Sequence, residues 1–79
     1  MKLPRDIGGL ELAKALARIG YAVSRQSGSH LRLTCAEPAE HHVTIPLHAP
    51  LKIGTFAAIL AEVAERQSVS REELLTRLF

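Results

Sequence analysis

Apolar and polar residues alternate in three short runs between residues 21 and 47: "YAVSRQ", "HLRLTC" and "HHVTIPL". A period of two predicts β-strands, because successive side chains on a strand point to opposite faces. Turn residues separate the runs: "SGS" predicts a tight turn in which Gly28 takes a positive φ, and Pro38 marks a loop over 36–40. The shared faces are Tyr21 and Val23 in the first run, Leu31, Leu33 and Cys35 in the second, and His41, Val43, Ile45 and Leu47 in the third.

A helical period appears on either side of these runs. "GGLELAKALARIG" places Leu12, Leu16 and Ile19 on one face of a helix, and Gly20 follows as a helix stop. Thr55 is predicted to be the N-cap of a second helix, "FAAILAEVAER", whose apolar residues form a continuous stripe. A third helix is predicted in "SREELLTRLF", which opens with capping-box spacing.

These elements predict one α+β domain, residues 1–79, in the order αβββα(α). Short connections between successive strands favour a three-stranded antiparallel sheet, with the helices packed on one face. The register follows from keeping every apolar side chain inward, which pairs Cys35 with His41 and His30 with Pro46. The other face then carries histidine, arginine and threonine, and is open to water.

Composition narrows the function classes. The chain has 79 residues, of which 47% are hydrophobic and 23% charged, so it reads as a globular protein and not a disordered one. It has no Trp, one Tyr and two Phe, which excludes aromatic stacking on bases as the main binding mode. A single cysteine rules out an internal disulfide and fits a reducing compartment. We expect a cytoplasmic protein, because the sequence shows neither a signal peptide nor a membrane-spanning run.

Charge is unevenly distributed along the chain. Residues 1–35 carry six Lys and Arg side chains against two acidic ones, whereas residues 36–79 carry four against six. A basic half favours a polyanionic partner, although ordinary solvated charge explains an asymmetry of this size equally well.

Two histidines are expected to converge on the open face of the sheet. In the predicted register His48 is a diagonal neighbour of His30, roughly 7–8 Å away between backbone positions. Imidazole titrates near neutral pH, so His30 is the candidate general base toward a ribose 2′-hydroxyl and His48 a candidate acid for the leaving oxygen. Candidates for phosphate binding are the cations Arg25, Arg32 and Lys52 and the backbone at Gly28 and Ser29. Such a scheme requires no metal and no cofactor.

Plainer interpretations of the same residues stay open. A histidine at the start of a strand is commonly a surface residue, and His48 also fits a simple hydrogen bond to a loop carbonyl. A zinc site made of His30, His42 and His48 lacks any supporting ligand spacing. Cys35 faces the predicted core, so we expect a small buried side chain and not a nucleophile.

Taken in order, several stretches resemble the HicA (YcfA-like) toxins, a family of small mRNA interferases. These stretches are "RIGY", "VSRQSGSH", "VTIPLH" and "LKIGTFAAILAEVA", and they extend over nearly the whole chain. The resemblance implies a fold like the double-stranded-RNA-binding domain, with His30 of the Gly28-Ser29-His30 tripeptide as the catalytic residue. It also implies endoribonuclease activity that cleaves mRNA and blocks translation, and a HicB-type antitoxin as the protein partner. Together with the histidine scheme above, we expect this endoribonuclease to be metal-independent.

The chain departs from the family pattern in places. Many members carry a second histidine or an aromatic residue just after the tripeptide, where this chain has Leu31 and Arg32, and many carry leucine where it has Phe56. These differences bear on substrate preference. Two other functions remain as alternatives to a nuclease: a non-catalytic RNA-binding module, and a domain that only binds a protein partner.

Overall fold

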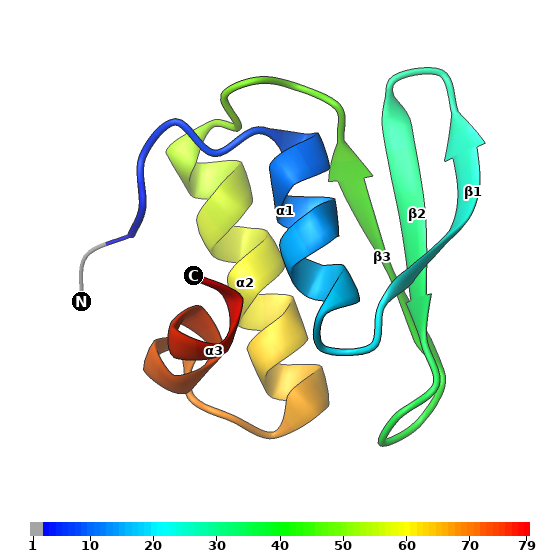
Figure 1. The fold of residues 1–79 in the computed structure, drawn as a ribbon, viewed down its shortest axis with the longest axis vertical. Coiled ribbons are helices and arrows are strands. Elements are labelled where there is room, and N and C mark those ends of the chain that lie inside the picture. Colours follow the sequence, from blue (N-terminus) through cyan, green and yellow to red (C-terminus); the bar gives the residue numbers. More distant parts are fainter. Residues whose placement is uncertain (1–2) are drawn as a thin grey trace.

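The structure is a computed structural model that describes residues 3–79. It confirms the α+β fold and the predicted order of elements, with a three-stranded antiparallel sheet in the order β1-β2-β3 (Figure 1). The elements are α1 (Gly9–Ala17), β1 (Ala22–Ser27), β2 (His30–Cys35), β3 (His41–Pro46), α2 (Ile53–Gln67) and α3 (Arg71–Leu78).

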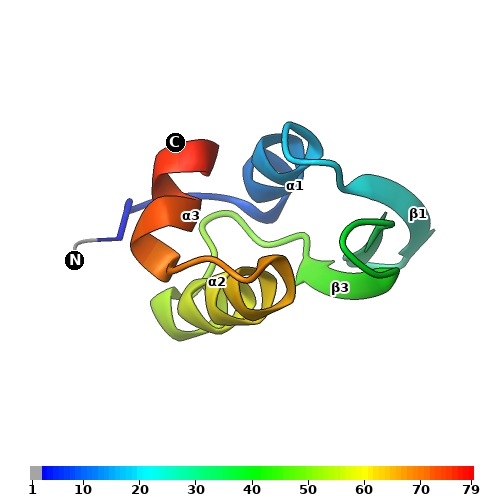
Figure 2. The same ribbon diagram turned by 90° about the horizontal axis from the view of Figure 1, so that it is seen from below.

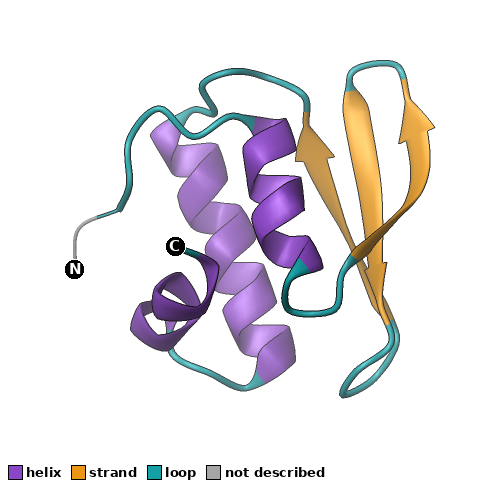
Figure 3. Cartoon of the chain, in the orientation of Figure 1, coloured by secondary structure: helices purple, strands orange, loops and turns teal. Residues whose placement is uncertain are grey.

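The helices lie on one side of the sheet, as the sequence predicts. Seen from below, α1 and α2 pack against the sheet, and α3 packs on α2 further from the strands (Figure 2). Of the two edge strands, β1 is the one farther from α2 (Figure 3). Within residues 3–79, none of the helices combines the length and the apolar composition that a membrane span requires.

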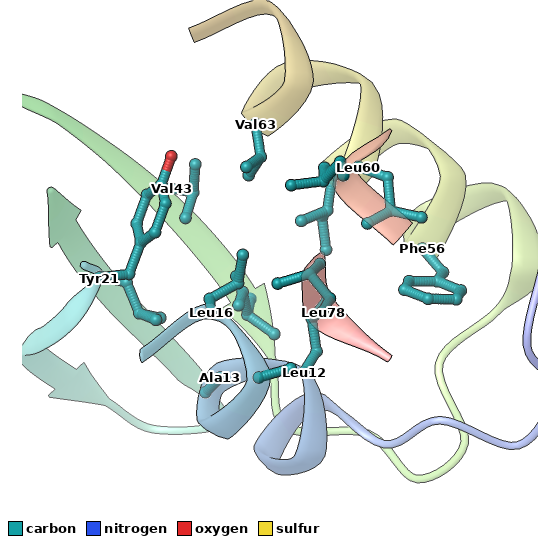
Figure 4. Close-up of a cluster of buried hydrophobic side chains, with 14 of the residues drawn as sticks. Leu12, Ala13, Leu16, Tyr21, Val43, Phe56, Leu60, Val63 and Leu78 are labelled. Atoms are coloured by element: carbon teal, nitrogen blue, oxygen red, sulfur yellow. The ribbon is translucent and has the colours of Figure 1, made fainter. Parts of the chain in front are cut away.

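Leucine side chains from all three helices meet the sheet in one hydrophobic core (Figure 4). Leu12 and Leu16 of α1, Leu60 of α2, and Leu74 and Leu78 of α3 are fully shielded from solvent. Burying a leucine side chain contributes about 1.5–3 kcal/mol to folding, so this cluster supplies much of the driving force of a small fold.

The register of β2 against β3 is the predicted one. Cys35 pairs with His41, Leu33 with Val43, and His30 with Pro46. The burial pattern along β2 alternates accordingly, since Leu31, Leu33 and Cys35 are buried while the residues between them are exposed or half-buried. The polar residues of β2 therefore emerge on the face that no helix covers.

The predicted start of the second helix is wrong. Helix α2 begins at Ile53 and has Lys52 as its N-cap, so Thr55 lies inside the first turn. Leu51 explains the earlier start, because it is buried and its backbone N–H donates to the carbonyl of Ile7 at 2.8 Å. That anchor turns the chain into the helix at once, and tertiary contact overrides the capping preference of threonine. The other cap is confirmed: the Ser70 hydroxyl accepts a hydrogen bond from the N–H of Glu73 at 3.0 Å.

Strand β1 also differs from simple alternation. Tyr21 is buried just before the strand begins, but every residue of β1 is exposed, including Val23, whose exposed fraction is 54%. The pairing with β2 shifts between Val23 and Arg25, where Ser24 forms a β-bulge. The bulge moves Arg25 to the face opposite to the one that strict alternation from Tyr21 would give it.

Helix α1 begins directly against the end of β3, a close approach that the sequence analysis missed. A Cβ atom at Gly9 would lie 2.0 Å from the carbonyl oxygen of Pro46, so only glycine fits there. The Gly9 N–H donates to the carbonyl of His48 at 2.8 Å. This contact fixes the end of the strand that pairs with His30.

Gly28 opens the two-residue connection between Ser27 and His30, which are paired. Its φ is +57°, and a Cβ atom added at Gly28 would meet no heavy atom within 4 Å beyond its chain neighbours, so its requirement is conformational. A positive φ at the first central residue is the sign pattern of a type II′ hairpin turn, which favours glycine.

Replacing Gly28 with alanine should therefore lower the free energy of unfolding by about 1–2 kcal/mol. The matched control is Gly54→Ala in the first turn of α2, where nothing crowds the site and alanine is the better helix former. There we expect no loss, or a gain of up to about 1 kcal/mol. Urea denaturation of both variants measures the difference, and equal effects would contradict the turn assignment.

Candidate functional site

A shallow depression lies on the uncovered face of the sheet. All three strands contribute to it: Arg25 and Ser27 from β1, His30 and Arg32 from β2, and Thr44 from β3. Each of these side chains is exposed. The predicted general base thus lies with two of the three predicted cations, and the residues that line the depression come from positions up to nineteen residues apart in the sequence.

His30 occupies the first position of β2, held between the hairpin turn and the end of β3. Its backbone pairs with Ser27 on one side and Pro46 on the other. Beyond the strand, the carbonyl of Ser29 accepts a hydrogen bond from the N–H of Leu47 at 2.6 Å. The backbone around His30 is therefore fixed on both sides, while its ring remains accessible.

Arg25 and Arg32 are direct cross-strand partners in the depression. Like charges placed opposite one another on a sheet destabilise the fold, unless a counter-charge lies between them. Among residues 3–79 the only ion pair joins Arg77 and Glu73 on α3, so neither arginine has a carboxylate partner there. Such a pair is suited to binding an anionic ligand such as a phosphate.

The other predicted site residues lie outside the lining of the depression. Gly28 and Ser29 form the adjoining turn, and Lys52 is the exposed N-cap of α2. His48 is exposed in the segment after β3, and its backbone carbonyl accepts the bond from Gly9. The proposed roles of His48 and Lys52 stay predictions. Ser27 and Thr44 line the depression although the sequence analysis did not select them, because exposed hydroxyl residues on strands carry no distinguishing pattern.

A chain of polar contacts crosses the same face of the sheet. Oγ1 of Thr34 lies 2.7 Å from Nδ1 of His42 and 2.8 Å from Oγ of Ser24. Oγ of Ser24 in turn donates to the carbonyl of Arg32 at 3.2 Å. The chain joins all three strands and ends at the β-bulge.

A second polar cluster is buried under the other end of the sheet. Nδ1 of His41 donates to the carbonyl of Ala39 at 2.7 Å, and its Nε2 lies 2.6 Å from the hydroxyl of Tyr21. The amide of Gln67 donates to the same hydroxyl at 3.3 Å and to the carbonyl of Glu37 at 3.1 Å. In the tautomer whose ring hydrogen is on Nδ1, Nε2 of His41 accepts the hydroxyl hydrogen of Tyr21. His41 thus provides a hydrogen-bond partner for the buried hydroxyl of Tyr21 and holds the 36–40 loop through Ala39. It lies away from the depression.

No group of three or more His, Cys, Asp and Glu side chains within residues 3–79 is arranged to hold a metal ion. Cys35 is buried, as the sequence predicts, and its thiol donates to the carbonyl of Glu37 at 3.3 Å. The depression itself is lined by one imidazole, two guanidinium groups and the hydroxyl groups of Ser27 and Thr44.

Burial raises the pKa of Tyr21 above its ordinary value of 10.0, with the amide of Gln67 opposing the shift. The phenol loses its proton more readily in the unfolded chain, so its contribution to stability is complete below pH 10 and is lost as pH rises through the folded-state pKa. Because the chain has one tyrosine and no tryptophan, tyrosinate absorbance reports this group alone. We expect a native midpoint above that of the urea-unfolded chain. Coincident midpoints would contradict the buried hydrogen-bonded phenol.

The chain matches the family model of the HicA toxin of bacterial toxin-antitoxin systems over residues 9–64. The matched segment begins at α1 and ends within α2, and it includes every residue that lines the depression. No curated protein and no solved structure matches the chain.

Proposed function

Since the chain belongs to the HicA toxin family of bacterial toxin–antitoxin systems, we propose that it is a ribonuclease toxin that cleaves mRNA in the cytoplasm and so blocks translation. The observation that carries this proposal is the position of His30 in an exposed depression, beside two cross-strand arginines that have no acidic partner within residues 3–79. An imidazole next to paired cations matches what cleavage of a phosphodiester requires.

The proposed reaction is an internal transfer within the RNA strand. His30 takes the proton of a ribose 2′-hydroxyl, whose oxygen attacks the adjacent phosphorus. Arg25 and Arg32 stabilise the negative charge that grows on the phosphate oxygens. The bond to the 5′-oxygen of the next nucleotide breaks, that oxygen receives a proton, and a 2′,3′-cyclic phosphate remains. His48 is the candidate donor of that proton, and the scheme uses no metal ion.

The proposed protein partner is a HicB-type antitoxin. An antitoxin that inhibits by covering the depression must meet Arg25, Arg32 and His30, so acidic side chains are expected at that interface. Neutralising the two arginines would also relieve their mutual repulsion, which adds to the stability of such a complex.

Replacing His30 with alanine should reduce the rate of RNA cleavage by about 10²–10⁴-fold, which is the usual contribution of a positioned general base. The side chain is exposed, so the free energy of unfolding should change by less than about 0.5 kcal/mol. A labelled transcript, incubated with excess chelator, measures cleavage and its metal independence together. Gln26→Ala on the neighbouring strand is the control and should cleave at the wild-type rate.

Three results would contradict parts of this proposal. Undiminished cleavage by His30→Ala removes the general base from the scheme. Loss of wild-type cleavage in chelator replaces the imidazole mechanism with a metal-dependent one. Binding without any cleavage by the wild-type protein supports the non-catalytic RNA-binding module instead.

Replacing Arg32 with alanine should weaken RNA binding about tenfold at low salt and reduce the slope of log affinity against log salt by about 0.7, which corresponds to one phosphate contact. The free energy of unfolding should stay the same or rise by less than about 1 kcal/mol, because a like-charge pair is removed. The matched control is Arg71→Ala at the start of α3, which lies away from the sheet. A loss of affinity as large in the control would show that binding is not localised to the depression.

A further inference from the structure

Strand β1 pairs with β2 in a bulged register, and an unbulged register is also geometrically possible. From Ala22 opposite Thr34 and Val23 opposite Leu33, unbroken pairing would bring Arg25 opposite Leu31, on the side of the helices. In the structure Ser24 is the additional residue, and Arg25 pairs with Arg32 on the uncovered face. One residue of slippage therefore decides whether Arg25 reaches the depression.

The unbulged register carries little intrinsic penalty. In the structure the position opposite Leu31 is taken by Gln26, which is exposed, so an arginine there would stay in water. The unbulged pairing would also replace the two-residue turn at Gly28 and Ser29 with a three-residue loop, and hairpins tolerate both lengths. Something other than burial has to select the register.

The chain of hydrogen bonds across the uncovered face of the sheet ends at Ser24, the residue of the bulge. Each hydroxyl has one hydrogen, and only one assignment gives every contact a donor: Nδ1–H of His42 donates to Thr34, Thr34 donates to Ser24, and Ser24 donates to the carbonyl of Arg32. The Ser24 hydroxyl therefore ties the bulge to the backbone of the strand that carries Arg32.

We propose that Ser24 is a positioning residue, and that its hydroxyl, supported by Thr34 and His42, holds β1 in the bulged register that places Arg25 beside His30. The inference rests on the proposed function only in that the ligand of Arg25 is taken to be RNA. Its structural part, the choice of register by a side-chain hydroxyl, stands independently of catalysis.

Ser24→Ala removes the hydrogen bond that selects the bulged register. Deletion of Ser24 removes the additional residue itself, so no bulge is needed to bring Arg25 to the uncovered face. In the deletion variant the chain from Tyr21 alternates regularly and brings Arg25 opposite Arg32 without a bulge. Ser24→Ala should therefore weaken RNA binding about three- to tenfold, whereas the deletion variant should bind within about twofold of the parent. Thr34→Val should weaken binding in the same direction as Ser24→Ala, but less.

Binding is measured on a His30→Ala background, with a labelled oligoribonucleotide over a range of salt concentrations. Arg25→Ala should lower the salt slope by about 0.7, and the double variant with Ser24→Ala should bind no more weakly than Arg25→Ala alone. Cross-strand nuclear Overhauser contacts should show Arg25 next to Arg32 in the parent, and partly next to Leu31 in Ser24→Ala.

Two results would overturn the inference. Equal losses in Ser24→Ala and in the deletion variant would mean that the hydroxyl acts on RNA directly, and unchanged cross-strand contacts in Ser24→Ala would mean that it does not select the register. No RNA affinity in the parent would instead contradict the proposed function, and the cross-strand contacts would still decide the role of Ser24.

Discussion

Burial of Leu31 and Leu33 against the helices fixes the side on which His30 and Arg32 emerge. Because side chains alternate along a strand, a slip of one residue between β2 and β3 would exchange the two faces and expose both leucines. Each fully buried leucine contributes about 1.5–3 kcal/mol, so the pairing of these two strands is the most strongly determined feature of the sheet. Packing of the core therefore determines the face of the sheet on which His30 and Arg32 of the candidate site lie.

The position of Arg25, which β1 contributes to the candidate site, is not determined by the core in the same way. Strand β1 is exposed along its whole length, so its register is not set by apolar burial. Its start is anchored by Tyr21, which is buried and bonded to His41. With the two-residue turn at Gly28 and Ser29 the strand holds one residue more than regular pairing needs, and Ser24 is that bulged residue; with a three-residue turn it would pair without a bulge. The position of Arg25 therefore depends on polar contacts, which contribute much less to the free energy of folding than burial of the core does.

This difference explains how much the sequence could predict. Periodicity located the three strands and three helices, and the inward apolar set gave the register that pairs His30 with Pro46. The bulge at Ser24 leaves no trace in a hydrophobic pattern, because no residue of β1 is buried. The start of α2 was misplaced because the buried Leu51 outweighs a local cap. The close approach at Gly9 depends on a strand more than thirty residues away, which no local pattern contains.

The chemistry of the uncovered face follows from what the fold leaves unsatisfied there. In residues 3–79, buried side-chain polar atoms all have hydrogen-bond partners, yet two arginines face each other across adjacent strands without a carboxylate. Folding alone gives no reason for that arrangement, since the repulsion costs stability. On the proposed function, RNA and an acidic antitoxin surface would both neutralise the same two guanidinium groups. Both ligands then need Arg25 on this face, so mutual exclusion of substrate and antitoxin would follow from one pair of charges and from the bulge that holds it together.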